Sequence, residues 1–143
     1  MGRLMNRSLV TELFYDEPAG TFAEGYLLQF MPDLTRAVDD PRNGYWHCNL
    51  AKHDRLTWSE KVYELFGLPA GAPIEREWVV ERYSEQSKKT LEQVRSMGLK
   101  RKMGFILDAE LALGADNSWI RVLAVPILAA GQVVGLHGLK RAL

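Results

Sequence analysis

The sequence contains very little cysteine: Cys48 is the single one among 143 residues. One cysteine excludes an internal disulfide and the cysteine cluster of a structural zinc site, and it favours a reducing compartment. No run approaches the roughly 20 apolar residues of a membrane-spanning helix. The N-terminal residues are interrupted by arginines and lack the pattern of a signal peptide. We therefore expect a cytoplasmic protein without membrane insertion.

An excess of charge of one sign is also missing, since 18 Lys and Arg side chains balance 18 Asp and Glu side chains. Proteins that bind nucleic acids usually carry a basic excess that neutralises phosphates, so we expect no nucleic-acid partner. There is no phosphate loop, nucleophile elbow or metal-spaced cluster. The acidic pair Asp108 and Glu110 lies on the polar face of an expected strand, which is typical of solvent-facing side chains. These absences predict a protein that is not an enzyme and has no metal site.

The length and composition fit one domain, with 47% hydrophobic and 25% charged residues. A cluster of breaker residues at 39–44 predicts a boundary between an N-terminal extension, residues 1–40, and the main body, residues 41–143. In the extension, Thr21 and Glu24 have the spacing of a capping box. The side chains that follow at helical spacing predict an amphipathic helix whose apolar stripe needs a partner surface: Phe22, Tyr26, Phe30 and Leu34.

The main body shows two short strand patterns, then helical patterns, then three long strand patterns. We expect strands at 45–50 and 55–58, a short helix from Ser59 to Gly67, one or two helices within 75–97, and strands at 105–113, 118–128 and 132–139. This order predicts an α+β fold with one five-stranded antiparallel sheet and helices on one face. Because the strand at 118–128 is apolar on both sides, the other face also needs a cover. The N-terminal helix, from the same chain or from a dimer mate, is the expected cover.

Four segments resemble motifs of the PAS domain family. GYWHCNL at residues 44–50 resembles the opening strand motif GxWxxDL, and LTWS at 56–59 with YELFGL at 63–68 resembles the lxWS…yxlfG segment that follows it. DNSWIR at 116–121 is similar to the DGxxRW hairpin. The run from Pro126 to Gly138 resembles the closing glycine-containing strand. The resemblance spans about residues 41–140 and implies a PAS-like fold.

Three motifs depart from the family pattern. The HPeDr motif before the long helix reads YSEQS at residues 83–87, and the EyR motif reads ELA at 110–112. The DIT signature that leads into an output helix is replaced by LKRAL at 139–143. The last departure puts direct coupling to a C-terminal kinase or cyclase in doubt. We expect either a free-standing sensor or a fragment of a longer signalling protein.

The resemblance implies a signal-sensing domain that binds a small ligand or partner between sheet and helices. The bound state would be transmitted through dimer or helix packing. The pocket candidates are Trp46, Trp58, Tyr63, Phe66, Tyr83, Phe105, Trp119 and His137. Ordinary core packing is the alternative for each of them. The expected interface of a homodimer is the helical stripe of Phe22, Tyr26, Phe30 and Leu34, and a signalling protein is the expected further partner.

The sequence does not identify a cofactor, and a small organic ligand of unknown identity stays open. Covalent flavin chemistry is not expected, because Cys48 lies on a strand and lacks the NCRFLQ neighbours of the light-sensing members. Haem is not expected either, because residues 75–97 contain no histidine. Two other functions stay open. One is a ligand-free interaction or dimerisation module, and the other is a small-molecule enzyme with the cone-shaped fold of nuclear-transport-factor-like proteins.

Overall fold

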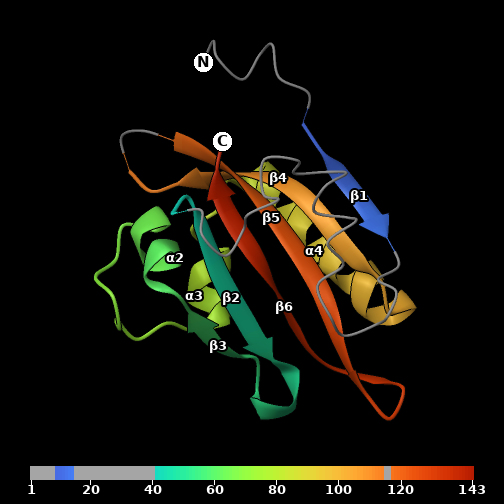
Figure 1. Ribbon diagram of the computed structural model, residues 1–143. Helices are drawn as coiled ribbons and strands as arrows, with labels where there is room; N and C mark the ends of the chain where they lie inside the picture. Colours follow the sequence, from blue (N-terminus) through green and yellow to red (C-terminus); the bar gives the residue numbers. More distant parts are fainter. Residues whose placement is uncertain (1–8, 15–40, 115–116) are drawn as a thin grey trace.

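The computed structural model describes residues 9–14, 41–114 and 117–143 of the chain. In these residues a six-stranded antiparallel sheet has the order β1-β4-β5-β6-β2-β3, and the helices lie on one face of it (Figure 1). The strands are β1 (Thr11–Phe14), β2 (Asn43–Asn49), β3 (Arg55–Trp58), β4 (Gly104–Ala112), β5 (Asn117–Ala129) and β6 (Gln132–Ala142). The helices are the single 3-10 turn η4 (Leu50–Lys52), α2 (Glu60–Leu65), α3 (Arg76–Val80) and α4 (Glu85–Arg101).

The order of elements confirms the α+β prediction: two short strands, then helices, then three long strands that close the same sheet. The expected number of five strands is wrong, because β1 adds a sixth strand beside β4. β1 is only four residues long and its first two residues are exposed, so it shows little of the alternation that identifies a strand. It also belongs to the segment that the sequence assigned to the N-terminal extension.

A buried carboxylate helps to hold β1 on the edge of the sheet. The Val10 amide donates to Asp108 Oδ2 at 2.8 Å, and the Val10 carbonyl accepts from the Asp108 amide. The same carboxylate accepts two hydrogen bonds from the Arg121 guanidinium, at 2.6 and 2.8 Å. The Asp108 side chain is therefore fully buried, whereas the sequence pattern suggested that it faces solvent. The Val10 backbone just before β1 and the Arg121 guanidinium contact this carboxylate in place of solvent.

Side chains alternate between two apolar clusters on opposite faces of the sheet. The cluster under the helices contains Phe105, Leu107 and Val122 together with Val62, Val79 and Val94 from the helices. The opposite cluster contains Phe14, Ile106, Leu123, Val125 and Leu139. The sheet is thus apolar on both faces, as the pattern of β5 predicted. The expected cover of the second face, with Phe22, Tyr26, Phe30 and Leu34, lies outside the described residues.

No helix in the described part of the chain is long and apolar enough to cross a membrane.

Candidate functional site

A small cavity lies between the helix-covered face of the sheet and helices α3 and α4. Its volume is about 60 Å³. Its wall is mostly apolar and includes a few ionisable groups; the lining residues are Trp46, Cys48, Leu56, Trp58, Arg76, Val79, Val80, Tyr83, Leu91, Arg95, Phe105, Val122, Leu136 and Lys140. An apolar wall with a small number of polar groups is the usual composition of a ligand site.

The Lys140 amine is the unusual group in this wall. Strand alternation on β6 places Leu136, Gly138 and Lys140 on the face that the helices cover. Only 7% of Lys140 is exposed. Four aromatic rings surround its Nζ atom, with centroids at 5.6 Å (Trp46), 5.7 Å (Trp58), 4.9 Å (Phe66) and 5.7 Å (Tyr83). The arrangement is an aromatic cage around an amine.

Hydrogen bonding to this amine is sparse. Nζ donates to the Tyr83 hydroxyl at 3.1 Å. Within residues 9–14, 41–114 and 117–143, no carboxylate lies within ion-pairing distance of it. Burial lowers the pKa of Lys140 from 10.5 to about 7, and it raises the pKa of Tyr83. The ring faces favour the ammonium form and act against the shift at Lys140. Removing the amine from water is nevertheless the main effect on its pKa, and an electrostatic effect of Cys48 opposes it only in part.

Tyr83 is held under the sheet by backbone and side-chain bonds to β4. It forms an isolated bridge with Leu111, and the following Ser84 amide donates to the Glu110 carbonyl at 2.9 Å. Ser87, in the first turn of α4, accepts from the Glu110 amide through its hydroxyl at 2.8 Å. These bonds fix the link between α3 and α4 against β4. The hydroxyl of Tyr83 is thereby positioned at the Lys140 amine.

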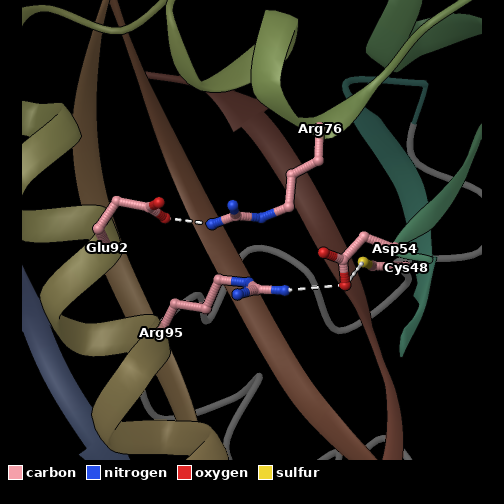
Figure 2. Close-up of polar contacts among 5 residues, drawn as sticks. All are labelled: Cys48, Asp54, Arg76, Glu92 and Arg95. Carbon is pink, nitrogen blue, oxygen red and sulfur yellow. Dashed lines mark hydrogen bonds and ion pairs between the residues drawn. The ribbon is translucent and has the colours of Figure 1, made fainter. Parts of the chain in front are cut away.

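Two arginines contribute further positive charge to the cavity wall, and each has an acidic partner (Figure 2). Arg76, at the start of α3, pairs with Glu92 of α4. Arg95 of α4 pairs with Asp54, whose Oδ1 atom lies 3.4 Å from Arg95 Nη2 and 3.9 Å from Cys48 Sγ. Burial, with a smaller effect of the Asp54 carboxylate, raises the pKa of the Cys48 thiol. The paired charges cancel, so the amine of Lys140 decides the net charge of the cavity.

A larger surface hollow of about 800 Å³ lies next to the cavity. It is bordered by the turn between β2 and β3 and by the loop that precedes α3. Leu56 and Arg76 line both spaces, so these two side chains separate them.

Half of the pocket candidates from the sequence line the cavity: Trp46, Trp58, Tyr83 and Phe105. Phe66 contributes a ring to the cage and stacks on Trp58, with 4.7 Å between the centroids. Tyr63 meets Trp58 edge-on at 5.3 Å and borders the outer hollow instead. Five of the eight candidates therefore line the cavity or belong to the cage around the Lys140 amine.

Trp119 and His137 do not belong to this site, which corrects the sequence-based assignment. On β5 the residues under the helices are Ile120 and Val122, so Trp119 points to the opposite face. His137 pairs with Val125 and His47 across the sheet, also on that opposite face. Burial, with a smaller contribution from His47, lowers the pKa of His137. On each strand the neighbouring residue, Ile120 or Leu136, is the one that faces the helices.

Several site residues were missed from the sequence, above all Lys140, Arg76 and Arg95. The expected last strand ended at residue 139, whereas β6 continues to Ala142. Extending the alternation from Leu136 by four positions would have put a lysine on an inward-facing position, and that was the available signal. Arg76 and Arg95 gave none, because arginines on amphipathic helices normally face solvent. No cluster of three or more metal-ligating side chains occurs in the described segments of the chain.

Comparison with known proteins identifies the fold through structure alone. No family model matches the chain, and no curated protein matches it by sequence. The N-terminal domain of a diguanylate cyclase with a PAS/PAC sensor from Marinobacter aquaeolei superimposes with a TM-score of 0.63 at 16% identity, covering 70% of this chain and 94% of that one. A domain of a light and redox sensing histidine kinase from Haloarcula marismortui gives 0.61 at 11% identity, covering 78% and 98%.

A PAS domain from Colwellia psychrerythraea gives a TM-score of 0.58 at 16% identity and covers 79% of this chain and 96% of its own. These neighbours have the PAS fold that the resemblance at the sequence level implied. The cone-shaped alternative is therefore not the fold of this chain. The protein has the fold of a PAS domain.

Proposed function

We propose that this chain is a signal-sensing domain that binds a small ligand in the cavity between sheet and helices. The single observation that carries the proposal is the amine of Lys140, which is buried in the cavity wall and has no carboxylate partner among the residues that the structure describes. Burying such a group is unfavourable unless something compensates for it. Strongly perturbed groups that face a cavity are common at functional sites. The structural neighbours named as PAS sensors and sensing kinases support the same role.

Transmission of the bound state would use the helices that form the cavity wall. Val79 of α3 and Leu91 of α4 face the cavity from the helix side, and Val122 and Leu136 face it from the sheet. A ligand between them changes the distance at which helices and sheet pack. It shifts the packing equilibrium only to the extent that it binds one arrangement more tightly than the other. The output is a homodimer or a signalling protein that recognises one of these arrangements.

We propose no catalytic step for this domain. We also expect the domain to lie in the cytoplasm. The ionisable groups of the cavity are an amine, two guanidinium groups, a thiol and a phenol. Cationic groups of this kind bind and orient an anion. The raised pKa values of Cys48 and Tyr83 keep the thiol and the phenol in their neutral forms at neutral pH.

A second candidate is an interaction module without a ligand, and the small size of the cavity favours it. A volume of about 60 Å³ is well below the roughly 150 Å³ of a cavity that holds benzene. The buried Lys140 side chain and the four rings around its amine lie next to this small space. In this alternative the packed core is a rigid support for a binding surface elsewhere on the domain.

Native mass spectrometry of the purified protein, with an absorption spectrum of the same sample, tests the proposal. Extra mass per chain, or a band well beyond the absorption of tryptophan and tyrosine, is the expected result. The Val79→Leu variant narrows the cavity and should lose that mass, whereas Val133→Leu, outside the cavity wall, should keep it. A bare chain that no small molecule stabilises in a thermal-shift screen would contradict the sensor and favour the interaction module.

A further inference from the structure

The cavity has a net positive charge of one when Lys140 is protonated. Arg76 is balanced by Glu92, and Arg95 is balanced by Asp54. An aromatic cage and one hydroxyl surround the Lys140 amine, and no carboxylate of the described segments pairs with it. A buried charge of this kind is compensated most directly by an ion of opposite sign that enters the same cavity. A ligand with a single negative charge would therefore neutralise the cavity.

The size and polarity of the cavity restrict what the uncharged part of such an anionic ligand can be. The cavity volume of about 60 Å³ is less than half of the roughly 150 Å³ that accommodates benzene, so only a body of about two to four carbon atoms fits. Leu56, Val79, Val122 and Leu136 supply an apolar wall beside the amine. A short alkyl chain matches this wall, and a carboxylate matches the ammonium group.

We infer that the cavity binds a short-chain monocarboxylate whose carboxylate forms an ion pair with Lys140 and whose alkyl chain lies against the apolar wall. The inference rests on the proposed function, because it names the class of ligand for the same site. The Tyr83 hydroxyl, which accepts from Lys140, is the neighbouring group able to donate its own proton to the carboxylate. Entry runs from the outer hollow past Arg76 and Leu56, the two residues that border both spaces.

Binding should weaken with rising pH, because the ion pair requires the ammonium form. With a pKa of about 7 for Lys140, the protonated fraction falls about ten-fold between pH 6 and pH 8, and the apparent affinity falls with it. The other groups facing the amine are Tyr83 and Cys48, whose raised pKa values keep them neutral over this range. Those facing it from α3 and α4 are the guanidinium groups of Arg76 and Arg95, with their partners Glu92 and Asp54.

Isothermal titration calorimetry of the full chain with sodium propionate, compared with propionamide, tests the inference. Propionamide has nearly the same shape and no charge. Propionate is expected to bind saturably with a dissociation constant between about 10 μM and 1 mM, in keeping with its few non-hydrogen atoms. Propionamide should bind at least about ten-fold more weakly. Propionate affinity should fall about ten-fold from pH 6 to pH 8.

Two lysine variants separate the cavity amine from the remaining positive charge. Lys140→Met keeps an unbranched side chain of nearly the same length and removes the charge, so it should abolish propionate binding. Lys89→Met removes an exposed lysine from α4 and should leave the affinity within about two-fold of wild type. The pH dependence of the unmodified protein provides the same information if Lys140→Met does not fold.

The outcomes distinguish this inference from the sensor proposal. Equal binding of propionate and propionamide, or full binding by Lys140→Met, would overturn the assignment to carboxylates while leaving a ligand-binding sensor. A propionate affinity that does not change between pH 6 and pH 8 would also overturn it. If neither compound binds up to about 10 mM, the carboxylate inference fails, and the native mass spectrum decides separately whether the cavity holds another ligand.

Discussion

Replacing Lys140 with methionine is expected to stabilise the protein below neutral pH. The lowering of its pKa from 10.5 to about 7 corresponds to about 5 kcal/mol of unfavourable charge burial in the native state. The four ring faces offset part of this amount. Methionine also leaves the buried Tyr83 hydroxyl without its donor, which costs about 1–3 kcal/mol. We expect a net gain of about 2 kcal/mol for Lys140→Met, and about 3 kcal/mol when Tyr83→Phe is added.

The sign of the pH dependence follows from proton binding. Between pH 7 and 10.5 the unfolded chain keeps the proton of Lys140 while the folded chain loses it. The unfolded state then binds more protons, so the stability of the wild type rises with pH in this window. The charge penalty is complete below pH 7 and disappears above 10.5. The advantage of the variants should therefore be largest at pH 6 and decrease by about 3 kcal/mol by pH 9.5.

Urea unfolding followed by tryptophan fluorescence measures this difference, since Trp46 and Trp58 both lie at the cage. Curves at pH 6, 7, 8 and 9.5 for the wild type, Lys140→Met and the double variant give the free energies of unfolding. Lys89→Met is the control for the loss of an exposed lysine and should show no such pH dependence. The reasoning is refuted if the difference between wild type and Lys140→Met does not change with pH, or if the variant is less stable at pH 6.

Three further substitutions test other parts of the structure. Asp108→Asn removes the buried charge that faces Arg121 and should destabilise the fold by about 3 kcal/mol, measured by urea unfolding, with faster hydrogen exchange in β1. Gly138→Ala should prevent folding, as judged by circular dichroism, because the added Cβ would lie 1.7 Å from the Leu123 carbonyl oxygen. Phe30→Asp, on the helix expected from the sequence, should shift a dimer towards monomer in analytical ultracentrifugation or unfold the chain.

For each of these three substitutions, one outcome would contradict the prediction. A stability of Asp108→Asn equal to wild type would show that the carboxylate is not needed to hold β1 at the edge of the sheet. A folded Gly138→Ala protein of normal stability would contradict the close approach of β5 and β6. A dimer that is unchanged by Phe30→Asp would remove the predicted helix from the interface.

Local patterns in the sequence determined most of the secondary structure. The alternation of apolar residues and the breakers at 39–44, 114–117 and 129–131 placed every strand except β1, and β3 has the bounds expected for it. The helical spacing at 75–97 allowed for two helices, and the structure has α3 and α4 with a break between them. The motifs at 44–68 and 116–138 implied the PAS fold that the structural neighbours share. These features depend on residues close in the chain, so a single sequence contains them.

Contacts between distant segments were decided by the tertiary structure. β1 is a strand because its backbone meets β4, about 90 residues or more further along the chain, and because Asp108 bonds to Val10 just before it. Lys140 is a buried amine because β6 extends past its expected end and alternation turns the residue towards Trp46, Trp58, Phe66 and Tyr83. The sequence shows only a lysine near a strand end, where solvent exposure is the usual state. Strand register and the packing of helices on one face decide which side chains meet, and both arise from non-local contacts that a local pattern does not encode.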